Sequence, residues 1–142
     1  MSISIIRATT DAEILACYAV MRELRPHLVE TEFVLTVRRM EQQEFRLASL
    51  SAEGDVAAVV GYRVVEMLRT GRMVEVDDLV TASRTRSSGH GKALLDWVTA
   101  EARAEGCSVL ELDSAVHRAD AHRFYFRERM HVLGFHFSTS LS

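Results

Sequence analysis

The most informative part of the sequence is residues 73–91, which read MVEVDDLVTASRTRSSGHG. The first eight of these residues are rich in valine and predict a β-strand. Gly89 and Gly91 predict a tight turn, and Lys92 to Glu105 are mostly good helix formers. A helix that is entered through glycines presents backbone N–H groups and a favourable dipole to an anion. The stretch therefore predicts a phosphate-binding turn between a strand and a helix.

Two other phosphate-binding motifs can be compared with this turn. A P-loop would need a different glycine spacing before its Gly-Lys pair, and Arg86 and Ala93 break that pattern. A Rossmann fingerprint would place a small residue at position 94, where this chain has Leu94, although Asp113 lies at about the distance expected of a ribose-binding acid. The P-loop is disfavoured, and dinucleotide binding remains an alternative.

The turn resembles the motif of the GNAT superfamily of N-acetyltransferases, which is Arg or Gln, two residues, Gly, one residue, then Gly or Ala. Arg86, Gly89 and Gly91 match it completely. The resemblance extends to residues 76–80, residues 121–125 and Gly134-Phe135. It covers the chain from Ile5 to its last residue, although the N-terminal half matches only in its order of elements.

This resemblance implies an α/β (α+β) fold in one domain, residues 1–142. The central sheet would be mixed but mostly antiparallel, with six to seven strands, one of them bulged, and about four flanking helices. Asp78 falls where alternation with Val74 and Val76 would put a core residue, so one extra residue in the strand would re-aim it. An unbulged strand with Asp78 lining a cleft fits the sequence equally well.

Local signals predict the order of the elements. Thr10 and Glu13 can form a capping box, so a helix is expected from Asp11 to near Arg25, and Thr31 is expected to cap a second helix. The other expected elements are strands at residues 2–7, 45–50, 56–65, 73–80 and 109–112, a helix at 118–130 and a final strand at 134–138. The strand at 109–112 should lie parallel to that at 73–80, because a helix connects them.

The resemblance also implies where acetyl-coenzyme A (acetyl-CoA) would bind as co-substrate. Leu79, Val80 and Thr81 would present backbone groups to the pantetheine arm and the thioester carbonyl. The diphosphate would lie in the turn formed by Arg86, Ser87, Ser88, Gly89, His90, Gly91 and Lys92.

Acyl transfer to an amine also needs a general base and a proton donor for the departing thiolate. Tyr125 matches the family's usual proton donor. The chemically suitable bases are Glu75, Asp77, Asp78, His117 and His122. We favour Asp78 as the general base, followed by Glu75.

Composition narrows the classes of partner. The formal net charge of -3 and the lack of any run of five like charges argue against nucleic acid. Cys17 and Cys107 lie too far apart for a Cys-x-x-Cys site, and the histidines lack ligand spacing, so no metal is predicted. The sequence shows no signal peptide and no long apolar run, which predicts a cytoplasmic protein without a membrane partner.

The sequence thus predicts an acyl-CoA-dependent N-acetyltransferase that passes acetyl from acetyl-CoA to a primary amine of a small molecule or a protein. Two alternatives are a non-catalytic sensor that binds acyl-CoA and a dinucleotide-binding protein. The sequence does not identify the amine, and both a monomer and a homodimer fit it.

Overall fold

The computed structural model describes residues 2–142, which fall into two compact units. The first unit ends at Glu111 and the second is Leu112–Ser142. The single domain expected over residues 1–142 therefore stays a prediction.

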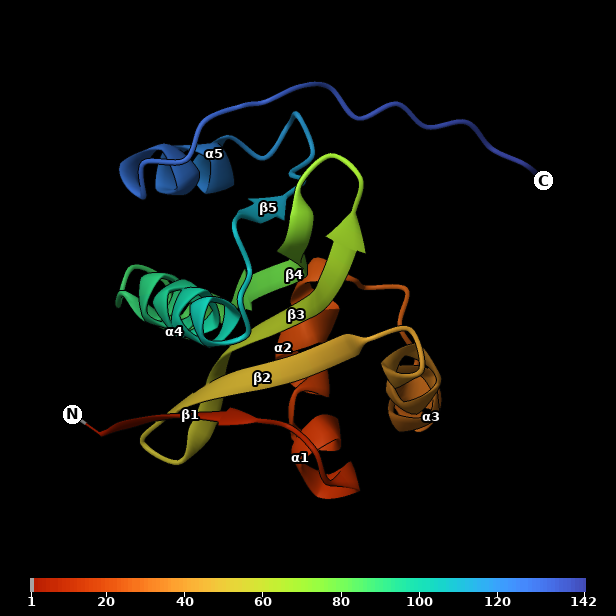
Figure 1. The fold of residues 1–142 in the computed structure, drawn as a ribbon. Helices are drawn as coiled ribbons and strands as arrows, with labels where there is room; N and C mark the ends of the chain where they lie inside the picture. Colours follow the sequence, from red (N-terminus) through yellow and green to blue (C-terminus); the bar gives the residue numbers. More distant parts are fainter. Residues whose placement is uncertain (1) are drawn as a thin grey trace. The chain divides into compact units, whose positions relative to one another are not determined.

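A five-stranded sheet in the order β1-β2-β3-β4-β5 forms the centre of the fold (Figure 1). Its strands are β1 (Ile3–Arg7), β2 (Phe45–Ala52), β3 (Asp55–Met67), β4 (Gly71–Thr81) and β5 (Leu110–Leu112). The first four strands pair antiparallel. Beside β4, the N–H of Ser108 donates to Arg72 O (2.9 Å) and that of Val74 donates to Val109 O (3.0 Å). These bonds advance in the same direction along both segments, as the predicted parallel pair requires.

The prediction of six to seven strands is wrong for the described residues, which form five. The missing element is the strand expected at residues 134–138, where the structure has neither helix nor strand. A strand requires a neighbour that pairs its backbone N–H and C=O groups, and alternating apolar side chains alone do not supply one.

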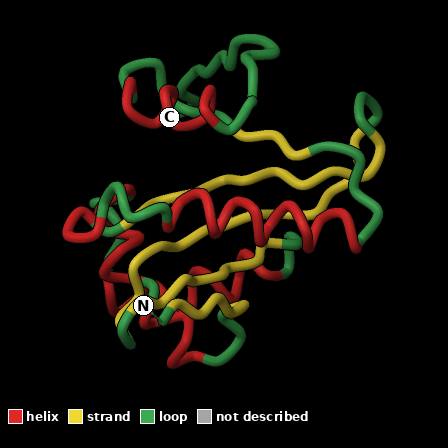
Figure 2. The backbone as a smooth tube through the Cα atoms, turned by 90° about the vertical axis from the view of Figure 1, so that its left-hand side faces the viewer, coloured by secondary structure: helices red, strands yellow, loops and turns green. Residues whose placement is uncertain are grey.

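Four helices cover the two faces of the sheet in the first unit. Helices α1 (Asp11–Ala16), α2 (Tyr18–Leu24) and α3 (Glu30–Glu41) lie on one face, and α4 (His90–Ala104) lies along the other (Figures 1 and 2). The face of α1–α3 holds a buried apolar cluster that includes Ile14, Met21, Phe33, Phe45 and Val59. On the α4 face, Trp97 meets Tyr62 edge to face, with ring centroids 6.3 Å apart.

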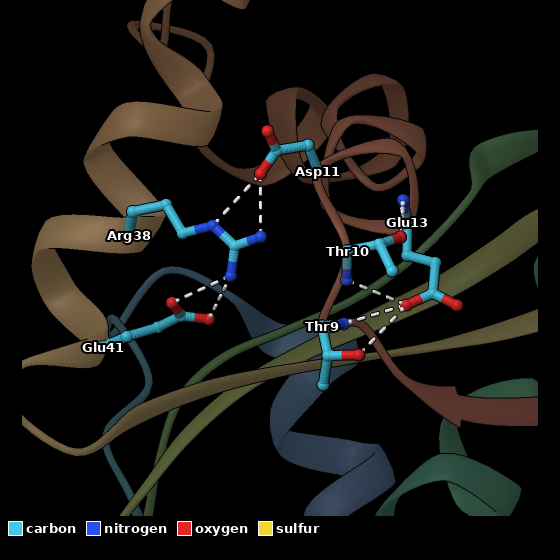
Figure 3. Close-up of polar contacts among 6 residues, drawn as sticks. All are labelled: Thr9, Thr10, Asp11, Glu13, Arg38 and Glu41. Atoms are coloured by element: carbon cyan, nitrogen blue, oxygen red, sulfur yellow. Dashed lines mark hydrogen bonds and ion pairs between the residues drawn. The ribbon is translucent and has the colours of Figure 1, made fainter.

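The first helix begins at Asp11 through the predicted capping box (Figure 3). Thr10 Oγ1 accepts the N–H of Glu13 (3.2 Å), and Glu13 Oε1 accepts the N–H of Thr10 (3.0 Å). Arg38 of α3 also reaches back to α1, because its guanidinium bridges Asp11 and Glu41. These contacts fix α3 beside the start of α1.

Two expected helix boundaries are wrong. The helix expected from Asp11 to near Arg25 is divided at Cys17, whose N–H bonds Ile14 O (3.0 Å) while its thiol donates to Glu13 O (3.4 Å). The thiol thus bonds the carbonyl that a continuous helix would reserve for the N–H of Cys17. Helix α3 begins at Glu30, with Val29 as its N-cap, so Thr31 lies inside the helix instead of capping it.

The second unit contains helix α5 (Ala119–Arg127), which is shorter than the helix expected at 118–130. Arg129, two residues after the helix, has a φ of 65°, which a right-handed helix does not allow. In residues 2–142, no helix combines the length and the apolar character that crossing a membrane would require.

Candidate active site

The central feature of the candidate site is a β-bulge in β4. Gly61 of β3 pairs with Asp78, but the next residue, Tyr62, pairs with Val76, so Asp77 has no register partner in β3. Of the two arrangements that the sequence allowed, the strand therefore adopts the bulged one. The extra residue turns Asp78 to the face of α1–α3, whereas Val76 lies opposite Tyr62 on the α4 face.

Gly61 makes room for the Asp78 carboxylate. A Cβ atom at position 61 would lie 2.6 Å from Phe45 Cζ and 2.8 Å from Asp78 Oδ2, which is closer than real Cβ contacts allow. Only glycine fits here without movement of the ring or the carboxylate. The positions of the Gly61 backbone, the Phe45 ring and the Asp78 carboxylate therefore depend on one another.

Two arginines converge on the bulge. Arg25, the C-cap of α2, donates from Nε to Asp78 Oδ1 (2.8 Å) and from Nη2 to Asp77 O (3.1 Å). Arg63 of β3 donates to both carboxylate oxygens of Asp77, at 2.7 and 2.8 Å. Three elements thus bring two guanidinium groups and two carboxylates together.

Sequence reasoning found the carboxylates but missed both arginines. Arg25 is 53 residues from Asp78, and no local pattern links them. A signal in the sequence could have found Arg63. It lies in the strand predicted to pair with β4, and its register partner there is Glu75.

Burial makes Asp78 a stronger base than an ordinary aspartate. Desolvation raises the pKa of Asp78, and the hydrogen bond and charge of Arg25 oppose this rise only in part. A carboxylate with a raised pKa holds an abstracted proton more firmly. Among the predicted bases, Glu75 lies near Asp78, since its register partner Arg63 also contacts the bulge.

The remaining acid–base candidates belong to the second unit. His122 Nε2 lies 2.9 Å from Ala115 O, and the Tyr125 ring lies 5.4 Å from that of Phe124. Burial raises the pKa of Tyr125, and Arg118 partly offsets that rise. Their roles and that of His117 stay predictions.

A helix follows the predicted turn, as expected, but it begins two residues before Lys92. Helix α4 begins at His90, and Gly89 precedes it as N-cap with a φ of 80°. Ser87 also has a positive φ, of 70°. The N–H of Ala93 donates to Gly89 O (3.1 Å) and starts the helical ladder. The N–H groups before Ala93 thus belong to the first turn, where a helix provides no internal acceptors.

Hydrogen bonds to two other elements fix the segment just before this turn. The N–H of Ser83 donates to Glu23 Oε1 (3.0 Å), and Arg84 donates to Val56 O (2.8 Å). Arg86 Nη2 lies 3.9 Å from the same Glu23 oxygen. Sequence reasoning missed Glu23, which ties α2 to the candidate phosphate turn.

The His90 side chain lies away from solvent. It is buried, and neither of its ring nitrogens has a hydrogen-bond partner in the part of the chain that the structure describes. Residues 2–142 also contain no group of three or more His, Cys, Asp or Glu side chains placed to bind a metal ion.

Comparison with known proteins identifies the family. The family model described as Acetyltransferase (GNAT) family matches residues 13–131. The chain belongs to this family. This GNAT chain is 33% identical over 118 residues to the uncharacterized N-acetyltransferase YhdJ of Bacillus subtilis, a match that covers 82% of the chain and 83% of YhdJ. These relationships support an acetyltransferase.

Two further comparisons concern a more distant relative and the fold. The chain is 33% identical over 89 residues to an aminoalkylphosphonate N-acetyltransferase of Salmonella typhimurium, a match that covers 62% of this chain and 58% of that enzyme. The crystal structure of ribosomal-protein-alanine N-acetyltransferase from Brucella melitensis superposes with a TM-score of 0.84 at 14% identity, covering 99% of this chain and all of that one. The latter likeness shows a shared GNAT fold.

Proposed function

We propose that this GNAT protein transfers acetyl from acetyl-CoA to a primary amine of a small molecule or a protein. The observation that carries the proposal is structural: a bulged strand is followed by a turn with positive φ angles and then by the start of α4 at His90. Those elements combine a largely buried carboxylate with a helix N-terminus suited to an anion.

The diphosphate of acetyl-CoA would lie at the turn of residues 86–92. Gly89 removes side-chain bulk where the backbone must approach the phosphates, and Arg86 adds positive charge. Leu79, Val80 and Thr81 would hold the pantetheine arm through backbone groups. In support, β4 continues to Thr81, well beyond Arg72 and Val74, which bond the segment leading into β5.

Asp78 would act as the general base, directly or through a water molecule. The amine nitrogen must lose a proton before its lone pair attacks the thioester carbonyl carbon. As the C–N bond forms and the C–S bond breaks, the nitrogen releases a second proton and the sulfur leaves as a thiolate, which takes up a proton. The largely buried Asp78 carboxylate, with its raised pKa, suits the role of proton acceptor, and Glu75 is the second candidate.

Tyr125 would protonate the departing thiolate, a role that rests on the family resemblance. A coenzyme thiol is comparable to a cysteine thiol, whose pKa is ~8.5, so its thiolate is already a fair leaving group. Loss of the Tyr125 hydroxyl should therefore slow the reaction without abolishing it.

The test compares two glycines of similar conformation. Gly89 and Gly54 have φ values of 80° and 86°, and a Cβ at either would have nothing within 4 Å. Alanine at either should cost about 1 kcal/mol of folding free energy. Calorimetric titration should show about tenfold or more weaker acetyl-CoA binding for Gly89→Ala and little change for Gly54→Ala.

Thiol release from acetyl-CoA across a panel of amines then separates an enzyme from a sensor. The proposed enzyme should release thiol with at least one amine, whereas a sensor would bind acetyl-CoA without turnover. Failure of the wild-type protein to bind acetyl-CoA would remove the basis for both functions.

A further inference from the structure

At the bulge in β4, the basic side chains are more exposed to solvent than the acidic side chains that they contact. The side chains of Arg25 and Arg63 are 43% and 37% exposed, whereas those of Asp78 and Asp77 are 15% and 25% exposed. The guanidinium groups therefore form the more solvent-accessible part of the cluster. A molecule that approaches Asp78 from solvent would meet positive charge beside the carboxylates.

Each arginine still has donor capacity. Arg25 uses Nε and Nη2, and Arg63 uses Nε and Nη2, in the hydrogen bonds to Asp77 and Asp78. A guanidinium has five N–H donors in a planar fork. In residues 2–142, Nη1 of neither arginine donates a hydrogen bond at this site. Both groups can therefore accept a second anion without releasing their carboxylates.

The charges in this cluster bear on the kind of amine that would fit. Two guanidinium groups pair with two carboxylates, and Glu75 adds a further acidic charge near Arg63. A molecule with only positive charge would pair with the carboxylates but would be repelled by both arginines. A molecule with one ammonium and one oxyanion group would instead complement both halves of the cluster.

We propose that the acceptor amine carries an oxyanion group, a carboxylate, phosphate or phosphonate, that Arg25 and Arg63 bind through their unused guanidinium donors. This proposal rests on the proposed function and specifies its substrate class. The oxyanion end would be held at the arginines, and the amine would lie toward Asp78. Arginine suits this task because its planar fork matches the geometry of oxyanion groups.

The test uses pairs of amines that differ in charge. One pair is 3-aminopropanoate and its neutral amide, 3-aminopropanamide. Two further probes are 2-aminoethylphosphonate, which carries a different oxyanion, and 1,4-diaminobutane, which has only positive charge. The wild-type protein should acetylate at least one of the two oxyanion-bearing amines with the highest kcat/KM of the panel.

Arginine variants then assign this preference to the cluster. In Arg25→Met and Arg63→Met, the ratio of kcat/KM for the oxyanion-bearing amine to that for the neutral amide should fall about 10- to 100-fold. A change in Asp78 basicity or in folding would affect both amines alike and leave the ratio unaltered. Arg38→Met is the matched control, because Arg38 also bridges two carboxylates but lies on α3, beside α1. Its ratio should equal that of the wild type.

Three outcomes separate this inference from the proposed function. Highest activity on 1,4-diaminobutane, or an unchanged ratio in both arginine variants, would overturn the inference and leave an acetyltransferase. A reduced ratio in both variants but not in Arg38→Met would support it. Binding of acetyl-CoA without turnover of any amine would contradict the enzyme and, with it, the substrate class.

Discussion

The two faces of the central sheet differ in the polarity of the side chains that they bury. On the α4 face, buried Leu50, Leu94 and Val98 form an apolar core. The opposite face is equally apolar around Phe45 but becomes charged where Asp78 meets Arg25. The bulge in β4 makes this possible, because it moves one carboxylate out of the alternation that fills the α4 face. We therefore expect one face mainly to stabilise the fold, whereas the other also holds Asp78, the proposed general base.

Removing a large side chain from the α4 face should cause the greatest loss of stability. Leu50 is fully buried in β2. Leu50→Ala should lower the free energy of unfolding by about 2–5 kcal/mol, because it leaves a cavity. Urea unfolding measures this loss. The kcat/KM per folded molecule should stay at the wild-type value, since the charged cluster lies on the other face.

A second leucine variant in β2 tests whether the two faces differ in function. Leu47 is also buried in β2 but belongs to the core of the other face and pairs with Gly61. Leu47→Ala should lower both the stability and kcat/KM. Equal kinetic effects of the two leucine variants would mean that the faces are not functionally distinct.

Adding a methyl group at Gly61 should have the next largest effect. The new Cβ would press on the Phe45 ring and on the Asp78 carboxylate. Overpacking of this kind typically costs about 1–3 kcal/mol. Gly61→Ala should also lower kcat/KM, because the carboxylate must move.

A second substitution tests the cause of this loss. Phe45→Leu should relieve the contact with the ring, so the double variant should recover part of the stability that Gly61→Ala loses. Strictly additive losses would show that the ring and the new methyl group do not compete for space.

The two faces also differ in how well the sequence predicts them. Local patterns were sufficient for the hairpin strands, the capping box at Thr10 and the helix after Gly89, because neighbouring residues determine those elements. The choice between a bulged and a regular strand was not local. It depends on the register of β4 against β3 and on the space at Gly61.

The errors in the sequence predictions have the same origin. The break at Cys17 coincides with a thiol hydrogen bond that helix propensity does not describe. The alternating residues 134–138 have the composition of a strand, but the structure contains no ladder for them. The ion pair between Arg25 and Asp78 joins distant segments, so only the folded chain reveals it. Sequence thus predicted the acidic half of the cluster and missed its basic half.

Removing the cap of α1 should have a smaller effect on stability than either core change. Thr10 satisfies the N–H of Glu13, which the helix itself cannot pair. Thr10→Ala should lower the free energy of unfolding by about 1 kcal/mol, measured by urea unfolding. Because this cap lies away from the bulge in sequence and contacts none of its four charged residues, kcat/KM should not change. A clear kinetic defect would show that α1 influences the charged cluster.

The smallest change in stability, with the opposite sign, is expected at Asp78. Burial raises the pKa of Asp78 in the folded state. Ionisation of Asp78 therefore destabilises the fold, and the free energy of unfolding falls as pH rises from the pKa of the unfolded chain, ~3.9, through the pKa of the folded chain. Asp78→Asn keeps an oxygen that can accept the hydrogen bond of Arg25 and removes the cost of burying a charge. At pH 7 this variant should match or exceed the wild-type stability, by no more than about 1 kcal/mol.

The difference should shrink as pH falls below the pKa of Asp78, because the wild-type side chain then becomes neutral as well. Urea unfolding at pH 7 and near pH 4 measures both values. The kcat should fall about 100- to 10,000-fold, as expected for loss of a general base. If Asp78→Asn were instead much less stable than the wild type at pH 7, the ion pair with Arg25 would outweigh desolvation. Asp78 would then be a structural carboxylate, and Glu75 would become the favoured base.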